Sequence, residues 1–145
     1  MNVRAKDLVE RLVTGVHRSV YSVSRGRIGG RGLGMPVVQL TTVGRRSGKR
    51  RRTMLAAPVT DGDRIVLVAS HRGDDRHPAW FLNLRDHPDV ELTMRGETRR
   101  MRARVASPDE KATLWPQIVE MCPDYGQYQR RTERDIPVVI VEPRA

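Results

Sequence analysis

The chain has 145 residues, of which 38% are hydrophobic, so it can form one domain with a modest core and leaves no room for a second. Its net charge of +10 at pH 7 favours an acidic partner, such as nucleic acid, an anionic membrane or a small polyanion. Its single cysteine, Cys122, excludes an intramolecular disulfide and a cysteine-based metal site.

An amphipathic helix is predicted at residues 7–22. Asp7 is its N-cap, Glu10 follows three residues later, and apolar side chains recur at helical spacing. Such a helix either docks on its own domain or lies on an anionic membrane surface. Because no apolar run could cross a bilayer and no secretory signal is evident, we expect a cytoplasmic protein, with peripheral contact at the inner face of the cell membrane as the alternative.

A glycine-rich linker follows, with five glycines between Gly26 and Gly34. An Arg-Gly tail that binds nucleic acid is the alternative interpretation of this stretch. We therefore divide the chain into a helix and linker at 1–35 and a folded domain at 36–145.

A basic loop between two predicted strands is the most distinctive stretch. Val37 to Val43 is rich in β-branched residues that alternate across two faces, and Met54 to Val59 resumes an apolar run. The loop between them carries two glycines, a serine and six cations, which are Arg45, Arg46, Lys49, Arg50, Arg51 and Arg52.

The composition of this loop favours an anion. Gly44 and Gly48 let the backbone curl until its N–H groups point inward, while Arg45, Arg46 and the Ser47 hydroxyl add donors suited to phosphate or carboxylate. The loop is not a Walker A motif, because three residues rather than four separate its glycines. A solvated basic turn is the alternative.

Two hairpins are predicted, one turning at Asp61-Gly62 and one at Gly96. The apolar run at 65–69 indicates a strand that is buried on both faces. Four consecutive apolar residues after Pro137 suggest a central position for the last strand. After the basic loop the predicted strands are at 53–60, 64–70, 90–95, 98–105 and 136–141.

Two helices are predicted between these strands. A short one at 79–85 follows Pro78 and places Trp80 and Asn83 on one face, where a buried Asn needs either backbone or a ligand as its partner. A longer one begins at the N-cap Ser107 and ends near Met121. Strands in hairpins with a few helices describe a mainly β (α+β) fold, an antiparallel barrel with helical decoration.

No metal site and no hydrolytic arrangement is recognisable. His71, Asp74, Asp75 and His77 lie in one loop without the spacing of metal ligands, and we expect them to be solvated. Cys122 beside Pro123 is typical of a small buried residue. An anion loop, a Trp/Asn helix face and a tyrosine pair together suit a long, planar, polyanionic cofactor that carries the chemistry.

Several motifs in matching order resemble the deazaflavin-dependent nitroreductase and quinone reductase family. The resemblance covers roughly residues 37–143. It rests on Leu40 to Gly48, Val68 to Ser70, His77 to Leu84, and Tyr125 and Tyr128 ahead of Ile136 to Val138. Members adopt a split β-barrel like that of the pyridoxamine-phosphate oxidases and bind coenzyme F420, whose reduced deazaflavin passes a hydride to quinones, nitro compounds or other electrophiles.

The resemblance also implies residue roles, a small-molecule electron acceptor and a monomer or homodimer. Ser70, Tyr125 and Tyr128 would act as catalytic residues on the substrate side, although two tyrosines at helical spacing also suit packing. Ala56 and Cys122 stand where the nitroimidazole-activating member has aromatic residues, which implies a wider pocket. The coenzyme would be bound by Arg45, Arg46, Ser47, Gly48, Thr53, Met54, Ala69, Ser70, Ala79, Trp80 and Asn83.

Two alternatives use the same residues. A split barrel of this kind could bind FMN or carry the coenzyme without turnover. Nucleic acid could bind the Arg-rich loop, but aromatic residues make up only 4% of the chain and none interleaves with the basic run.

Overall fold

The computed structural model describes residues 34–144, so the helix predicted at 7–22 and nearly all of the linker lie outside the described residues. The strands are β1 (Val37–Val43), β2 (Arg50–Ala56), β3 (Val59–Asp61), β4 (Arg64–Val68), β5 (Asp89–Met94), β6 (Glu97–Val105) and β7 (Val138–Pro143). The helices are α2 (Ala79–Asp86), α3 (Pro108–Met121) and α4 (Asp124–Arg130), and a short 3-10 turn covers His71–Gly73.

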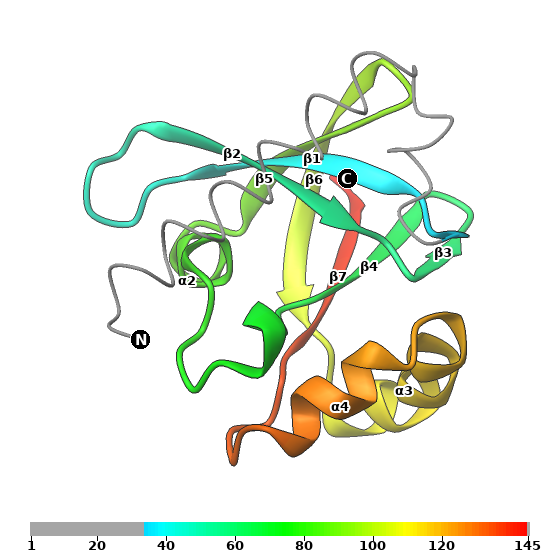
Figure 1. Cartoon of the computed structure of the whole chain (residues 1–145). Helices are drawn as coiled ribbons and strands as arrows, with labels where there is room; N and C mark the ends of the chain where they lie inside the picture. Colours follow the sequence, from blue (N-terminus) through cyan, green and yellow to red (C-terminus); the bar gives the residue numbers. More distant parts are fainter. Residues whose placement is uncertain (1–33, 145) are drawn as a thin grey trace.

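The seven strands form one curled antiparallel sheet in the order β2-β1-β5-β6-β7-β4-β3 (Figure 1). The mainly β fold and both predicted hairpins are confirmed. β7 lies between β6 and β4, as its apolar run predicts, and β2 and β3 form the two edges of the sheet.

The sheet curls around an inner core. Its concave face buries Leu40, Leu67 and Val139 from different strands, and α2 adds Phe81 and Leu84 to the same cluster. α2 therefore belongs to the barrel wall and does not lie on the surface as a separate element.

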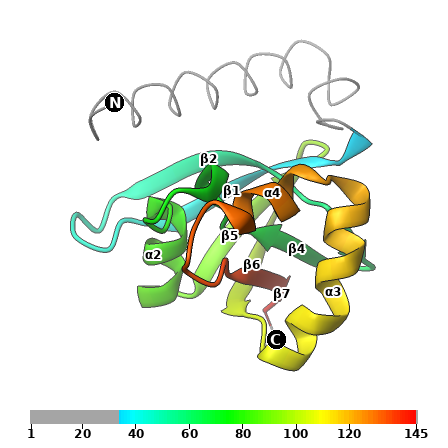
Figure 2. The ribbon, with the colours of Figure 1, turned by 60° about the horizontal axis from the view of Figure 1, so that its bottom comes forward.

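Helices α3 and α4 cover the outer face of β4 and β7. Ile118, Cys122 and Tyr125 pack there with Val66 and Val138, in a second buried cluster. The expectation that Cys122 is a small buried residue is confirmed. Figure 2 shows α3 and α4 side by side at this end of the sheet, away from α2.

The start of α3 follows its sequence signal. The Glu110 N–H donates to Ser107 Oγ at 3.2 Å, and the Ser107 N–H donates to Glu110 Oε1 at 2.9 Å, so both halves of a capping box are present. Arg104 of β6 also donates to both carboxylate oxygens of Glu110 through its two terminal nitrogens, Nη1 and Nη2, which ties α3 to the sheet.

Two predicted boundaries are wrong. The strand predicted at 53–60 is divided between β2, which ends at Ala56, and β3, which begins at Val59. The chain turns between them at Ala57-Pro58, where the Ala57 N–H donates to the Pro36 carbonyl. Arg50 to Arg52 lie in β2 and not in the loop, because they pair with Val43 to Thr41 of β1. An exposed edge strand tolerates this run of charges.

No helix within residues 34–144 has the length and apolar character that a membrane span needs.

Candidate functional site

The basic loop between β1 and β2 is shorter than predicted and comprises residues 44–49. Gly48 has a φ of 71°, which favours glycine, and a Cβ on Gly44 would lie 2.6 Å from Ser47 Oγ. Glycine therefore suits the backbone at position 48, and a side chain at position 44 would displace Ser47 Oγ from its place in the curled loop.

The loop uses much of its own hydrogen-bonding capacity to hold that shape. The Gly44 N–H donates to Lys49 O at 2.7 Å, the Gly48 N–H to Gly44 O at 2.9 Å, and the Lys49 N–H to Ser47 Oγ at 3.1 Å. Ser47 Oγ is thus an acceptor inside the loop, and its own proton remains to be donated. An anion at this loop would be held by side chains more than by the backbone N–H groups that the sequence interpretation emphasised.

Asn83 fastens the loop to α2. It is 5% exposed, its Oδ1 accepts from the Arg45 N–H at 3.0 Å, and its Nδ2 donates to Thr42 Oγ1 at 3.2 Å. The predicted need of this buried amide for a partner is met by the protein itself. Asn83 therefore orients the loop, and whether it also contacts a ligand stays a prediction.

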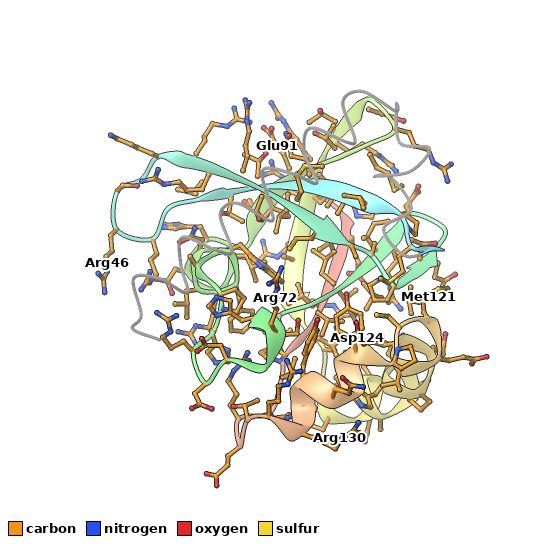
Figure 3. The ribbon with its side chains drawn as sticks, in the orientation of Figure 1. Arg46, Arg72, Glu91, Met121, Asp124 and Arg130 are labelled. Carbon is orange, nitrogen blue, oxygen red and sulfur yellow. The ribbon has the colours of Figure 1, made fainter. Side chains whose placement is uncertain are left out.

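The cations of this region differ in whether they are paired. Arg50 forms an ion pair with Glu91 of β5 on the convex face of the sheet. Within residues 34–144, no acidic side chain pairs with Arg45, Arg46, Lys49, Arg51 or Arg52. Figure 3 shows Arg46 at the tip of the loop, with its side chain directed away from the body of the protein.

The alternation of β2 divides its three arginines between two faces. Arg51 lies opposite Thr42, the residue that Asn83 binds, whereas Arg50 and Arg52 point to the other face. Arg51 is also close to the loop, since its Cγ lies 3.7 Å from where a Cβ on Gly44 would be. Of the three, only Arg51 shares a face with the Asn83 anchor.

The same alternation separates Thr53 from Met54. Their side chains leave β2 on opposite faces, with Thr53 opposite Leu40 and Met54 opposite Gln39. A ligand lying flat on one face would meet one of these side chains. A ligand lying along the edge of β2 could touch both, and β2 is an edge strand.

The end of β4 leads into a strained turn. Ala69 and Ser70 are buried, and His71, Arg72 and Gly73 have φ values of 47°, 54° and 80°. Left-handed conformations at consecutive non-glycine residues cost free energy and persist only where the surroundings hold them. In Figures 1 and 2 this turn lies between α2 and α4.

α4 packs directly on that turn. A Cβ on Gly73 would lie 2.8 Å from the Tyr128 carbonyl oxygen and 2.9 Å from Arg131 Cβ, so only glycine allows this approach. The packing places Ser70 near α4, the helix that carries both predicted catalytic tyrosines.

Arg134 holds the turn from the other side. This residue lies between α4 and β7, and its guanidinium donates to the Ser70 carbonyl at 2.8 Å, to the Ala69 carbonyl at 3.2 Å and to the Asp74 carbonyl at 2.7 Å. The prediction missed Arg134. Nothing in a single sequence distinguishes it from the other arginines of this basic chain.

His77 joins the same group. Its Nδ1 lies 3.2 Å from an Arg134 nitrogen and must accept, because a guanidinium only donates. Partial burial, and then the charges of Arg134 and Arg85, lower the pKa of His77 below 6.5. Asp74 accepts from the Arg76 N–H at 2.8 Å and Asp75 from the Thr132 hydroxyl at 2.8 Å. The expectation that these side chains are solvated is therefore wrong for His71, Asp74 and His77, which are partly buried, whereas Asp75 is exposed.

The two tyrosines of α4 pack edge to face, with ring centroids 6.1 Å apart. Tyr125 is buried in the outer cluster and Tyr128 lies at its margin. Burial raises the pKa of both hydroxyls above the usual value of 10, so both stay protonated near neutral pH. Tyr125 packs as the alternative interpretation expects, which leaves its catalytic role a prediction.

Trp80 and Ala79 belong to the first turn of α2. Trp80 is half-buried against the inner core and meets Phe81 edge to face, with ring centroids 6.5 Å apart, while Ala79 is exposed. Both are therefore reachable from outside the barrel.

None of the predicted site residues lines either of two hollows in the described part of the chain. One of about 540 Å³ is lined by Asp75 and residues 130–134, and a smaller one of about 90 Å³ lies at the barrel end near Asp63, Met94 and Arg99. Within the described part of the chain, no group of acidic, His or Cys side chains could hold a metal ion.

Comparison with known proteins identifies relatives over most of the chain. Residues 13–143 match the family model described as F420H(2)-dependent quinone reductase. A putative F420H(2)-dependent quinone reductase of Mycobacterium tuberculosis is 39% identical over 76% of this chain and 92% of its own length. A second F420H(2)-dependent quinone reductase of that organism is 37% identical over 89% of both chains.

Solved structures agree in fold. An F420-H2 dependent reductase is 37% identical, with a TM-score of 0.67 over 74% of this chain and 94% of its own. A structure described as a domain-swapped dimer is 33% identical, with a TM-score of 0.68 over 88% of this chain and 97% of its own. A protein of the pyridoxinephosphate oxidase family from Clostridium acetobutylicum is 11% identical with a TM-score of 0.54 over 74% of both chains, so it shares the fold alone. The predicted split β-barrel is confirmed.

The first prediction concerns the Asn83 anchor. Asn83→Ala removes the partner of the Arg45 N–H and of the Thr42 hydroxyl, and we expect a loss of about 1–3 kcal/mol in the free energy of unfolding. Urea denaturation measures this loss. Hydrogen exchange at the Arg45 amide should speed up as well. Asp86→Ala, at the exposed end of α2, is the matched control, and equal effects of the two variants would contradict the anchor.

The second prediction concerns His77. Folding lowers the pKa of His77, so on acidification the unfolded chain takes up this proton before the folded protein does. The contribution of neutral His77 to the free energy of unfolding is therefore present above pH 6.5 and is lost as the pH falls through the folded pKa. We expect the urea midpoint to fall more in the wild type than in His77→Gln between about pH 7.5 and about pH 5. His87→Gln, at an exposed position, should behave as the wild type does. If the urea midpoint of His77→Gln falls with pH as much as that of the wild type, His77 is not the source of this pH dependence.

Proposed function

The chain belongs to the F420H(2)-dependent quinone reductase family and is an oxidoreductase that uses coenzyme F420, and from this premise we propose that the loop at 44–49, the edge of β2 and the turn after β4 form its coenzyme site. The observation that carries the proposal is the set of cations around the Asn83 anchor that pair with no acidic side chain of residues 34–144. A phosphate and a tail of carboxylates would supply the missing negative charge.

The phosphate end would meet Arg45, Arg46, Ser47 and Gly48. The fit is supported by a loop that is already curled and fastened, so that little ordering is left to binding. Arg51 shares the face of this anchor and would add a further donor. Arg50 is committed to Glu91, and Arg52 points to the opposite face.

The ring end would lie along the edge of β2. This position is the one from which both Thr53 and Met54 could contact the coenzyme, with Ala79, Trp80 and Asn83 of α2 as the wall on one side. Ala69 and Ser70, at the end of β4, would form the other side. The apolar surroundings of these residues would exclude water.

The bound coenzyme supplies a hydride to the acceptor. The residues of the chain would stabilise the charge that then develops on an acceptor oxygen. Ser70, Tyr125 and Tyr128 are neutral hydroxyls whose donors would face that oxygen, and the raised pKa of each tyrosine keeps its proton available. The substrate is a quinone, by the family to which the chain belongs.

Two further properties are proposals of the same kind. A domain-swapped dimer among the similar structures supports a homodimer. Contact of residues 7–22 with an anionic membrane rests on the sequence pattern, and flotation of the full chain with anionic vesicles tests it.

A barrel that binds FMN is disfavoured because FMN would leave more of the loop cations unpaired.

The third prediction tests the coenzyme site. Arg51→Ala should weaken binding of reduced coenzyme F420 by roughly tenfold or more, because a hydrogen bond to a charged group contributes about 1.5–3 kcal/mol. Arg52→Ala removes the same charge from the other face of β2, and we expect a loss below about threefold. Coenzyme fluorescence measures the affinities, and quinone-dependent oxidation of the coenzyme measures turnover. Equal losses in both variants would show that only net charge matters.

The fourth prediction concerns the tyrosines. Tyr125→Phe keeps the buried ring and removes the donor, so turnover should fall while coenzyme affinity and unfolding midpoint stay near those of the wild type. Steady-state kinetics with a soluble quinone measures the fall. Wild-type kcat in this variant would assign Tyr125 to packing and leave Tyr128 and Ser70 as the donors.

A further inference from the structure

Arg134, in the segment between α4 and β7, contacts three other segments of the chain. Its Nε donates to the Asp74 carbonyl at 2.7 Å, Nη2 to the Ser70 carbonyl at 2.8 Å, and Nη1 to the Ala69 carbonyl and to His77 Nδ1, each at 3.2 Å. One planar guanidinium thus joins the end of β4, the left-handed turn and the approach to α2.

All four of these acceptors are neutral. Carboxylates are near, but they have other partners, since Asp74 binds Arg76 and Asp75 binds Thr132. An arginine that serves an ordinary ion pair would be aimed at one of these carboxylates. Arg134 instead fills the inside of the turn, where it draws together carbonyl dipoles that would otherwise repel one another.

The position of Arg134 is itself fixed by α4. Gln129 donates to the Arg134 carbonyl at 2.8 Å and accepts from the Ile136 N–H at 2.9 Å, and the Arg134 N–H donates to Thr132 Oγ1 at 3.3 Å. The guanidinium therefore has its geometry before any ligand arrives, because the backbone on both sides of it is held.

We propose that Arg134 is a positioning residue that holds Ala69 and Ser70 in the geometry that binds the coenzyme ring and the acceptor. The inference rests on the proposed function, since it is there that Ala69 and Ser70 face the ligand. Without the guanidinium, the turn loses the bonds to Ser70 and Asp74 that flank its left-handed residues, and it relaxes away from the site. Lysine cannot substitute, because a single ammonium cannot direct planar donors at four separated acceptors.

The test compares Arg134→Ala and Arg134→Lys with Arg130→Ala in the full-length protein. Arg130 is a matched control, because it is an exposed arginine at the end of α4 and belongs neither to the proposed site nor to the turn. We expect both Arg134 variants to bind reduced coenzyme F420 at least about tenfold more weakly than the wild type and to lose kcat, and Arg130→Ala to change either value by less than about threefold.

Rescue separates positioning from general stability. Guanidinium ion at low millimolar concentration should fill the space left in Arg134→Ala, strengthen its coenzyme binding and raise the melting temperature of the coenzyme-free variant. Urea at the same concentration should do neither, and the wild type should not respond. If Arg134→Ala does not fold, Arg134→Lys carries the affinity measurement, because it keeps the charge and the aliphatic stem.

The outcomes are distinct. Wild-type affinity and kcat in Arg134→Lys would overturn the positioning role and leave the coenzyme site intact. Weaker binding in Arg134→Ala without rescue by guanidinium would assign Arg134 to stability alone and overturn the inference as well. If Arg51→Ala binds the coenzyme as tightly as the wild type does, the proposed role of the loop is contradicted and that of Arg134 is not.

Discussion

One buried amide holds the loop at 44–49 against the rest of the barrel. Asn83 accepts from the loop at Arg45 and donates to β1 at Thr42, so the loop cannot move without breaking a partly buried hydrogen bond. This anchor explains how arginines that would repel one another are kept at one end of the sheet. It also means that α2 does more than close the barrel, because its buried face sets where the cations stand.

The two-residue period of an edge strand then decides which cations can act together. Arg50, Arg51 and Arg52 are a single basic run in the sequence, yet β2 sends the middle one to the face of the Asn83 anchor and its neighbours to the other. Glu91 neutralises Arg50 on that other face. A run of three charges therefore supplies one residue to the proposed site. The other arginines of this basic chain also serve solubility and ion pairing.

The sequence was sufficient to predict the features that neighbouring residues determine. The hairpins, the capped start at Ser107 and the central last strand each follow from neighbouring residues, and the ordered motifs identified the family and its cofactor. The prediction failed where the deciding partner is remote. The extent of β2 depends on pairing with β1, and the loop at 71–77 is ordered by Arg134, which lies 57 to 60 positions from the residues of this loop that it binds. No local pattern marks such a residue in a chain rich in arginine.

The two halves of the proposed site are held by different hydrogen-bonding residues, which come from different parts of the chain. The loop at 44–49 depends on Asn83, 38 positions from Arg45, whereas the turn after β4 depends on the segment that enters β7. The Ala69 N–H donates to Pro137 at 2.9 Å, so the place of β7 between β4 and β6 brings Arg134 to the carbonyls of Ala69 and Ser70. The ring side of the proposed site thus depends on the pairing of the C-terminal strand with β4. The strained turn persists because the segment that enters β7 supports it, which ties the geometry of the proposed site to the closed barrel.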